Sequence, residues 1–311
     1  MTADSVLQTH DLSKRYGSRL AVDRLNLTVE RGEIFGFLGP NGAGKTTTIR
    51  MLLGLIRPTG GTVELFGQEL ALDRARVLPR VGALIEAPAL YGYLSGRANL
   101  EVLAGPLRGI GKRRIDEVLR TVDLEQRQHD RVRSYSLGMK QRLGVAAAML
   151  NAPDLLILDE PANGLDPAGV VEMRDLLRSL VAAGATVFVS SHVLAEVQQL
   201  CDRVAIIARG RLVTEAPVAD LVRGRGDFEV NVDDPQAVVA LLAGTTWGAG
   251  ARAEGVLVVT PSPTGAGRDL VRFLVQHDVY PDRLAERTQN LESIFLELTA
   301  DEGLAGTEAA A

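Results

Sequence analysis

The chain of 311 residues has one cysteine, Cys201, and no apolar run that approaches the length of a membrane span. A single cysteine excludes an internal disulfide, which is typical of a reducing, cytosolic compartment. The longest apolar runs, such as residues 155–158, fall far short of the roughly 18–20 residues that cross a bilayer. No basic start followed by an apolar stretch and a cleavage site is found, so we expect a cytosolic protein in which Cys201 packs in the core.

The chain also lacks an excess of positive charge and any sustained heptad pattern. Its net charge of −5 argues against a general nucleic-acid binder, and we expect no nucleic-acid partner. The basic residues 112–114 lie among acidic ones and are interpreted as a solvated helix face. Apolar residues nevertheless make up 46% of the chain, which is enough for a substantial core.

What the chain does contain is a complete phosphate-binding loop. Residues 39–46 read Gly-Pro-Asn-Gly-Ala-Gly-Lys-Thr, after a predicted buried strand at 34–38 and before a helix predicted to bury Ile49, Leu52, Leu53 and Ile56. The glycines allow backbone N–H groups to turn toward phosphate, and the helix start adds its positive dipole end. Lys45 can reach the β- and γ-phosphates and the Thr46 hydroxyl can bind Mg²⁺, so we expect a nucleoside triphosphate and Mg²⁺ as ligands.

Two carboxylates, Asp159 and Glu160, directly follow the apolar run 155–158. The carboxyl ends of parallel strands carry the ligand site of such sheets, so both side chains are expected to face the phosphates. Asp159 suits Mg²⁺, directly or through water, and Glu160 could polarise an attacking water.

The pattern of apolar residues predicts an α/β protein with a parallel sheet. Continuous apolar runs at 155–158, 187–189 and 204–208 indicate buried strands, and a helix with Met173 and Leu177 on its buried face lies between the first two. Alternating residues at 25–29 and 63–65 indicate a small, mostly antiparallel β part. We predict an ATPase domain at residues 1–222, which contains a helical subdomain at about 90–151. An α+β accessory domain follows an Arg-Gly linker and spans residues 227–300, and residues 301–311 form a flexible tail.

With these motifs in this order, the chain resembles the ABC-type ATPases over about residues 5–220. Residues 155–161 look like the Walker B segment, and residues 135–142, Tyr-Ser-Leu-Gly-Met-Lys-Gln-Arg, resemble a degenerate ABC signature. Asn163-Gly164-Leu165-Asp166 resembles the D-loop, and Ser190-Ser191-His192 the end of the strand that carries the switch histidine.

The resemblance implies a head-to-tail dimer in which two copies enclose two ATP molecules. Glu160 and His192 would then be catalytic, Thr46, Asp159 and Glu86 would lie at the metal, and Asp166 would belong to the D-loop. Ser136 and Gly138 would contact the γ-phosphate held by the opposite subunit. The expected ATP-binding set is Tyr16, which stacks on adenine, with Gly39, Pro40, Asn41, Gly42, Ala43, Gly44, Lys45, Thr46 and Thr47.

Two departures from the family pattern narrow the resemblance. The signature carries Leu137 and Met139 where most members have Gly and Gln, although Ser136 and Gly138 are retained. Glu86 replaces the usual Q-loop glutamine, and either it couples the site to a partner or it merely pairs with an arginine such as Arg80 or Arg97. These features, and the segment 290–298, resemble the ATPase subunits of bacitracin-, lantibiotic- and daunorubicin-type exporters.

We therefore expect an ATP-hydrolysing subunit of an ABC exporter that drives efflux of a drug, antibiotic or peptide. It would be a homodimer held peripherally at the cytoplasmic face of the membrane by a separate permease. One alternative is a soluble ABC ATPase that acts on the ribosome or DNA, and another is a binding module that does not turn over. The transported substrate and the choice between homodimer and heterodimer are left open by the sequence.

Overall fold

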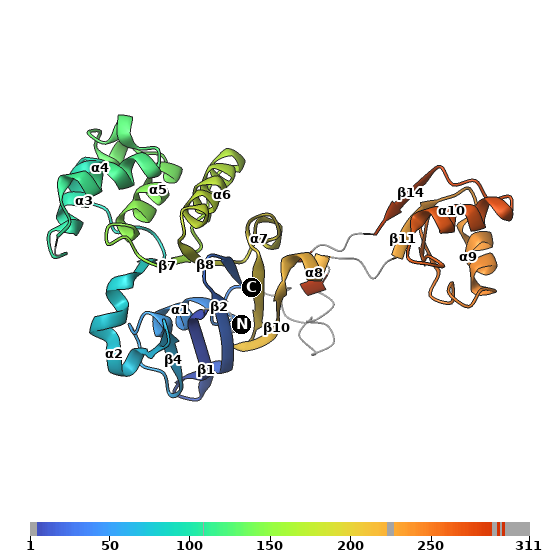
Figure 1. Ribbon diagram of the computed structural model, residues 1–311, viewed down its shortest axis with the longest axis horizontal. Helices are drawn as coiled ribbons and strands as arrows, with labels where there is room; N and C mark the ends of the chain where they lie inside the picture. The colour runs from blue at the N-terminus through green and yellow to red at the C-terminus, as the bar shows by residue number, and fades with distance from the viewer. Residues whose placement is uncertain (1–4, 108, 223–226, 288–290, 293, 296–311) are drawn as a thin grey trace. The chain divides into compact units, whose positions relative to one another are not determined.

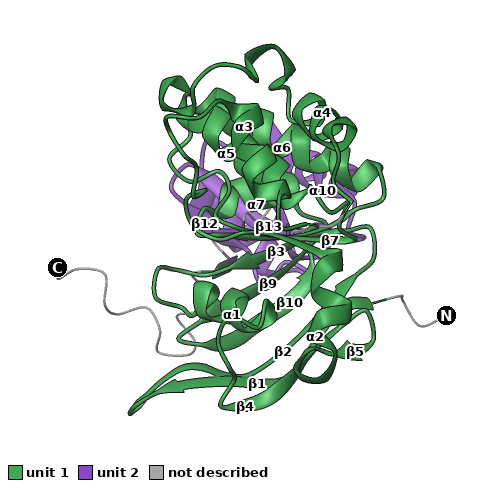
Figure 2. Cartoon of the chain, turned by 90° about the vertical axis from the view of Figure 1, so that its left-hand side faces the viewer, with its two compact units in different colours: residues 1–218, 295–311 green, residues 219–294 purple. Residues whose placement is uncertain are grey.

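The computed structural model describes residues 5–107, 109–222, 227–287, 291–292 and 294–295. The chain clusters into two compact units, residues 1–218 with 295–311 and residues 219–294, coloured separately in Figure 2. We call them unit 1 and unit 2. The predicted linker at 223–226 and the tail at 301–311 lie outside the described residues, as do residues 290, 293 and 296–298 of the segment 290–298.

Unit 1 is built on a six-stranded sheet with the strand order β10-β9-β3-β8-β7-β6. Five strands run parallel and β10 pairs antiparallel at the edge. Every residue of β3, β7 and β8 is buried, as expected of parallel strands covered on both faces. The bounds are β3 Ile34–Leu38, β6 Val81–Leu84, β7 Leu155–Asp159, β8 Thr186–Ser191, β9 Arg203–Ala208 and β10 Arg211–Pro217.

A second, antiparallel sheet has the order β2-β1-β4-β5 and confirms the small β part expected from alternation. Its inward side chains share one core with helix α1, Lys45–Leu52, and with the parallel sheet. Figure 2 shows α1 between the two sheets. The remaining bounds of this part are β1 Ser5–Tyr16, β2 Arg19–Glu30, β4 Gly60–Leu65, β5 Gln68–Glu69, α2 Leu70–Val77 and the 3₁₀ turn Leu78–Arg80.

The helix after the phosphate loop is shorter than the sequence predicts. Ile49 and Leu52 lie on its buried face, but α1 ends at Leu52, so Leu53 and Ile56 are beyond it. Gly54 follows with φ +63°, a left-handed conformation that stops a helix at little cost for glycine.

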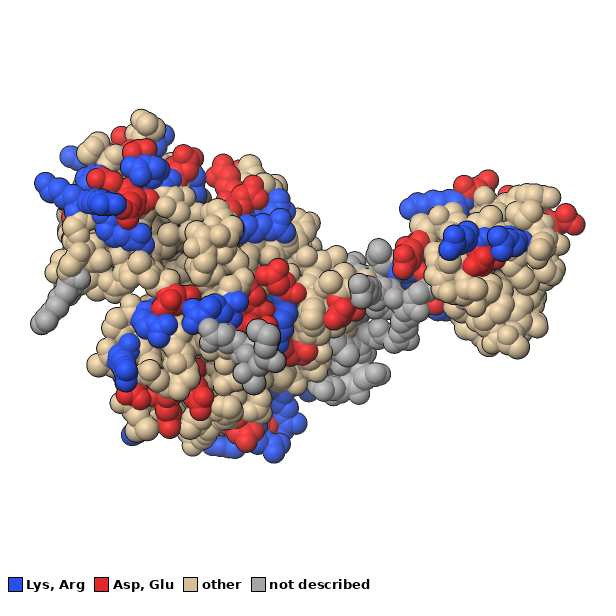
Figure 3. Space-filling model, in the orientation of Figure 1, with Lys and Arg blue, Asp and Glu red and all other residues tan. Residues whose placement is uncertain are grey.

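The region predicted to be a helical subdomain contains α3 Gly96–Ala104, α4 Lys112–Thr121 and α5 Leu137–Ala148, with 3₁₀ turns at Glu125–Arg127 and Val132–Ser134. Helix α4 buries Ile115, Val118 and Leu119 and leaves its charged face to solvent. Arg113 and Arg114 both pair with Glu117, and basic and acidic side chains alternate over this part of the surface in Figure 3. This confirms the solvated face for Lys112 and Arg113, whereas Arg114 is partly buried and also donates to the carbonyl oxygens of Met149 and Leu150.

Helices α6, Pro167–Ala182, and α7, Leu194–Leu200, follow the parallel strands β7 and β8, and α8, Val218–Val222, follows the antiparallel edge strand β10. Helix α6 buries Met173 and Leu177, as its apolar spacing predicts. Cys201 directly follows α7 and is buried against β3, where its Sγ would lie 2.9 Å from a Cβ built at Gly36. Burial also raises the pKa of the Cys201 thiol, so this residue packs in the core as expected and is a poor nucleophile.

Unit 2 is a four-stranded antiparallel sheet, order β12-β13-β11-β14, with helices α9 and α10 and its own core. Phe228 and Val230 alternate inward along β11 as predicted, and Asp234 caps α9 by accepting from Ala237 N at 3.0 Å. The bounds are β11 Asp227–Asn231, α9 Pro235–Ala243, β12 Arg252–Glu254, β13 Leu257–Pro261, α10 Gly267–Gln276 and β14 Arg283–Glu286.

Candidate active site

The phosphate loop of residues 39–46 leaves the carboxyl end of β3 and enters α1. Gly44 is at the N-cap position with φ +109°, and a Cβ there would lie 2.7 Å from the carbonyl oxygen of Ala21. Both the dihedral and the close approach of β2 require glycine. A hydrogen bond to the turn between β9 and β10 also holds the loop in place, because Ala43 O accepts from Gly210 N at 2.9 Å.

The start of α1 has no side-chain cap and no acidic residue in its first turn, where Thr46 and Thr47 lie. Its first N–H groups are therefore free of any competing anion from this helix. Lys45 is 6% exposed, and its Nζ donates to Gly39 O at 2.7 Å and lies 3.3 Å from Glu160 Oε1. Such a helix start beside a buried ammonium is suited to polyphosphate.

Asp159, at the end of β7, lies directly against this helix start. Its Oδ2 accepts from Thr46 Oγ1 at 3.0 Å, and its Oδ1 accepts from Ser190 Oγ at 2.5 Å. A hydroxyl beside a buried carboxylate is a hard-oxygen donor set, which fits Mg²⁺. In the described ranges no three His, Cys, Asp or Glu side chains are grouped so as to hold a metal.

Glu160 is held on the other side by His192. The two are joined by a 2.5 Å contact between His192 Nδ1 and Glu160 Oε2. Glu160 has φ +51°, a strained value for a residue with a side chain, and its N–H donates to Ser190 Oγ at 3.0 Å. The strain turns the carboxylate between Lys45 and His192, so the structure brings together Lys45, Asp159, Glu160 and His192.

Ser190 is a functional residue whose role the sequence pattern does not predict. Its hydroxyl donates to Asp159 and accepts from the Glu160 N–H, and so it orients both carboxylate residues. The signal was present, because Ser190 is the penultimate residue of β8, the strand hydrogen-bonded to β7, and pairs in register with Asp159.

Ser136 and Asp166 are both helix caps in this structure. Ser136 Oγ accepts from Met139 N at 3.2 Å at the start of α5, as predicted, and Asp166 Oδ1 accepts from Gly169 N at 3.1 Å at the start of α6. A Cβ built at Gly138 would find nothing closer than Leu165 at 3.9 Å. Nothing in the described part of the subunit therefore requires glycine at position 138.

Glu86 follows β6 with φ +58° and is 64% exposed. Its carboxylate pairs with Arg50 of α1 at 2.7 Å. The expected alternative, a pair with an arginine, is therefore present, but the two example partners are wrong, because Arg80 pairs with Asp154 and Arg97 with Asp116. Arg50 is 36 residues away, and no sequence pattern links the two.

Tyr16 ends β1 and leaves 49% of its surface exposed, with Lys14 Nζ 5.1 Å from the ring centre. An exposed ring is available for stacking. Across the residues that the structure describes, no helix is both long and apolar enough to cross a membrane.

Comparison with known proteins decides the family. The model of the family described as ABC transporter matches residues 22–163. The bacitracin transport ATP-binding protein BcrA of Bacillus licheniformis is 48% identical over 240 residues, covering 76% of this chain and 78% of the relative. The daunorubicin resistance ATP-binding protein DrrA3 of Streptomyces coeruleorubidus is 38% identical, covering 96% and 98%.

This chain belongs to the ABC transporter ATP-binding family. A solved structure, an ATP-binding subunit of an ABC transporter, agrees with the fold at a TM-score of 0.62 and 32% identity, covering 70% of this chain and 92% of its own. The predicted family, the α/β ATPase fold and ATP hydrolysis as the activity are thereby confirmed. As an ABC ATPase the chain binds ATP, and such subunits work with membrane components.

Proposed function

We propose that this ABC ATPase uses Mg-ATP hydrolysis, in a homodimer, to drive efflux of a drug, antibiotic or peptide through a separate permease at the cytoplasmic face of the membrane. The observation that carries the proposal is the single cluster of Lys45, Asp159, Glu160 and His192 at the phosphate loop. Relatives that share nearly the whole chain are named for daunorubicin resistance and bacitracin transport. Their names favour the transporter over a ribosomal, DNA-directed or non-hydrolysing protein.

Each residue of the cluster has a proposed task. The loop N–H groups and Lys45 bind the β- and γ-phosphates, Tyr16 stacks on adenine, and Thr46 with Asp159 would hold Mg²⁺. Mg²⁺, when bound, neutralises phosphate charge. Glu160 accepts a proton from the attacking water, and His192 keeps its carboxylate in position. Ser190 holds Asp159 and Glu160 in register.

Lys45→Ala tests the transport function directly. Transport of drug into inverted vesicles that hold the subunit and its permease should need ATP and should be lost in this variant. The affinity for ATP is expected to fall by about 10–100-fold, because a buried charge-assisted contact to phosphate is removed. Substrate movement that survives in Lys45→Ala, or that needs no ATP, would contradict the proposal.

We further propose that two copies share each ATP, because the described part of one subunit leaves room for a side chain at Gly138 and does not explain why this residue is glycine. Ser136→Asp separates the two roles of Ser136. Asp is as good a cap as Ser and suits a helix start, so the subunit should keep its stability. A carboxylate facing the γ-phosphate of the opposite subunit should nevertheless abolish hydrolysis, measured as phosphate release.

Mixing supplies the control for this prediction. Ser136→Thr keeps a hydroxyl cap and should remain active. A mixture of Ser136→Asp with Lys45→Ala should regain activity, because the mixed dimer has one site with both residues intact. Full activity of Ser136→Asp alone would limit Ser136 to capping.

Glu86 is proposed to couple the site to the permease. Its loop contacts α1 through Arg50 and continues to the exposed pair Tyr91 and Tyr93, whose rings meet edge to face at 5.8 Å. For its carboxylate to reach Mg²⁺, as proposed from the family resemblance, the pair with Arg50 must open. A movement that breaks this pair would thus change the contacts of the loop both at α1 and at Tyr91 and Tyr93.

Glu86→Ala should lower transport more than it lowers the ATPase rate of the isolated subunit. Arg50→Met removes only the partner of Glu86. It should change ATPase activity less than Glu86→Ala does, because a surface ion pair contributes only about 0–1 kcal/mol to stability and the Glu86 carboxylate itself is kept. Both rates are measured for each variant. Equal losses of transport and hydrolysis in Glu86→Ala would place Glu86 in the chemistry alone.

A last proposal concerns residues 227–300, which supply no phosphate-binding motif. Unit 2 has its own core around Phe228, Val230 and Leu242. We assign this part of the chain to regulation or partner contact, and the predicted boundaries of the ATPase and accessory domains stand as part of that proposal.

A further inference from the structure

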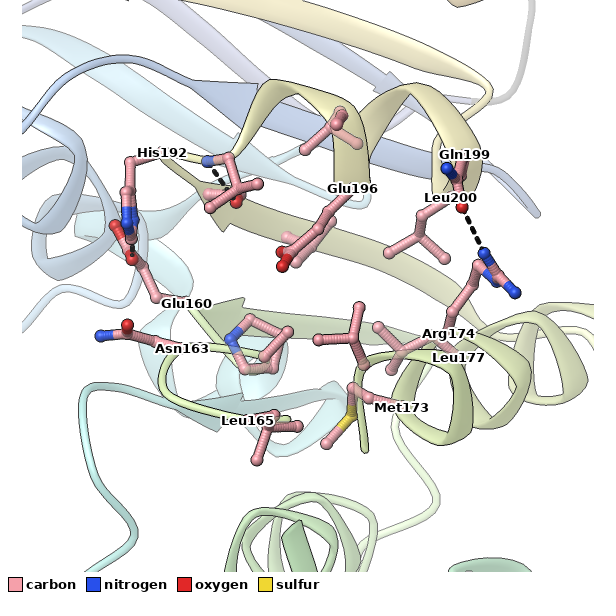
Figure 4. Close-up of a pocket in the computed structure, with 18 of the residues that line it drawn as sticks. Glu160, Asn163, Leu165, Met173, Arg174, Leu177, His192, Glu196, Gln199 and Leu200 are labelled. Carbon is pink, nitrogen blue, oxygen red and sulfur yellow. Dashed lines mark hydrogen bonds and ion pairs between the residues drawn. The ribbon is translucent and has the colours of Figure 1, made fainter. Parts of the chain in front are cut away.

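A cavity of about 460 Å³ lies in unit 1 between helices α6 and α7 and the loop that follows β7. This volume is typical of sites for small organic molecules. Figure 4 shows Met173 and Leu177 of α6 facing Leu200 of α7 across it, with Glu160 and His192 at one end. The cavity therefore extends away from the phosphate loop and touches the catalytic pair only at its rim.

One carboxylate points into this apolar space. Glu196 extends from α7 toward the middle of the cavity (Figure 4), and it makes no hydrogen bond or ion pair with any residue that the structure describes. Burial raises the pKa of Glu196, the charge of Glu160 raises it further, and His192 opposes the shift. An unpaired carboxylate in apolar surroundings is costly, so a donor that reaches it gains more than it would in water.

The other charges of the cavity also favour a cation. Arg174, at the far end, is engaged in part: its Nη1 donates to Gln199 Oε1 at 2.5 Å, and its Nε lies 3.7 Å from Asp175 Oδ1 but makes no hydrogen bond within the described residues. Glu160 lies at the near end, so an anionic ligand would meet two carboxylates. A ligand with a positive head and an apolar body matches both the charge and the lining.

We propose that this cavity is a binding site for a small hydrophobic amine, whose ammonium group pairs with Glu196 and whose apolar body packs against Met173, Leu177 and Leu200. The site is separate from the ATP site and does not depend on the proposed transport function. Its occupant would touch the loop 161–165, which leads from Glu160 to the Asp166 cap of α6. Occupancy would therefore alter the rate of hydrolysis without competing with ATP.

The probe is 4-phenylbutylamine, and its matched control is the neutral 4-phenylbutanol. Both are titrated against the full chain by calorimetry or ligand-observed NMR at neutral pH. The amine should bind about tenfold more tightly than the alcohol, because only the ammonium makes a charge-assisted contact with the partly buried carboxylate. Saturating ATP should leave amine binding in place.

Two variants locate the probe. Glu196→Gln should lose the preference for the amine, about tenfold, while keeping its melting temperature, because no partner of Glu196 is lost. Leu200→Trp fills the cavity and should weaken both compounds. Glu172→Gln, on α6 but outside the cavity lining, is the matched control and should bind like the wild type.

The proposal is overturned if the amine and the alcohol bind equally, or if neither binds. It is also overturned if Glu196→Gln binds the amine as tightly as the wild type, which would place the amine elsewhere on the protein.

Discussion

Replacing Glu160 by Gln is expected to lower the rate of ATP hydrolysis by about 10²–10⁴-fold while ATP affinity stays close to that of the wild type. Gln keeps the shape of the side chain, and its single carbonyl oxygen can accept from Lys45, whose Nζ lies 3.3 Å from Glu160 Oε1. Its NH2 group would then take the place of Oε2 and donate to His192 Nδ1, 2.5 Å from that oxygen, in the tautomer that leaves this nitrogen unprotonated. It cannot take a proton from water. The slow variant should also accumulate as an ATP-bound dimer, because closure no longer leads to hydrolysis.

Phosphate release, nucleotide titration and size-exclusion chromatography with ATP measure the three parts of this prediction. Glu101→Gln is the matched control, since Glu101 lies on α3 at 3.9 Å from Arg97 and away from the phosphate loop. It should hydrolyse ATP at the wild-type rate. Turnover in Glu160→Gln equal to that of the control would remove Glu160 from the chemistry.

The parts of this site that the sequence predicts are those set by short segments. The phosphate loop is contiguous, and the apolar run of β7 ends at Asp159, so the parallel sheet places Asp159 beside Thr46. The place of His192 follows in the same way, since β8 lies between β3 and β7 in the sheet. The strand order, together with the rule that ligand sites lie at the carboxyl ends of parallel strands, thus accounts for the position of most residues in the cluster.

The parts that the sequence does not predict depend on pairings between distant side chains. The Arg50–Glu86 pair joins a helix to a loop 36 residues later, and its formation depends on the left-handed turn at Glu86. The cavity around Glu196 arises from the spacing of two helices, α6 and α7, whose apolar faces look like ordinary core faces in the sequence. The early end of α1 at Leu52 likewise depends on the conformation of Gly54.

Replacing Arg203, which lies in a cluster of charged residues where β9 begins, should have the largest effect on stability that we expect. Arg203, the first residue of β9, donates to Glu33 Oε1 at 3.1 Å, to Glu215 Oε1 at 2.6 Å and to Thr28 O at 3.2 Å. Its guanidinium is 22% exposed and lies 5.6 Å from the ring centre of Phe35. One cation therefore serves two largely buried carboxylates.

The charges of this cluster make its stability depend on pH. Burial raises the pKa of Glu33 and of Glu215, and Arg203 opposes both shifts. A carboxyl group whose pKa is raised by folding contributes stability that is full below its unfolded pKa and is lost as pH rises through its folded pKa. Without Arg203 both pKa values should rise further, so the loss of stability should grow between acid and neutral pH.

Arg203→Met should therefore destabilise unit 1 by about 3–5 kcal/mol at pH near 7, because two buried carboxylates lose their cation, and by less at about pH 5. Urea unfolding followed by circular dichroism at both pH values measures the difference from the wild type. Arg113→Met is the matched control: Arg113 is 94% exposed in its pair with Glu117, and its loss should cost less than about 1 kcal/mol. Adding Glu33→Gln to Arg203→Met should restore part of the stability at neutral pH. A loss in Arg203→Met that is equal at both pH values, or no larger than that of the control, would show that Arg203 acts through packing on Phe35 rather than through its charge.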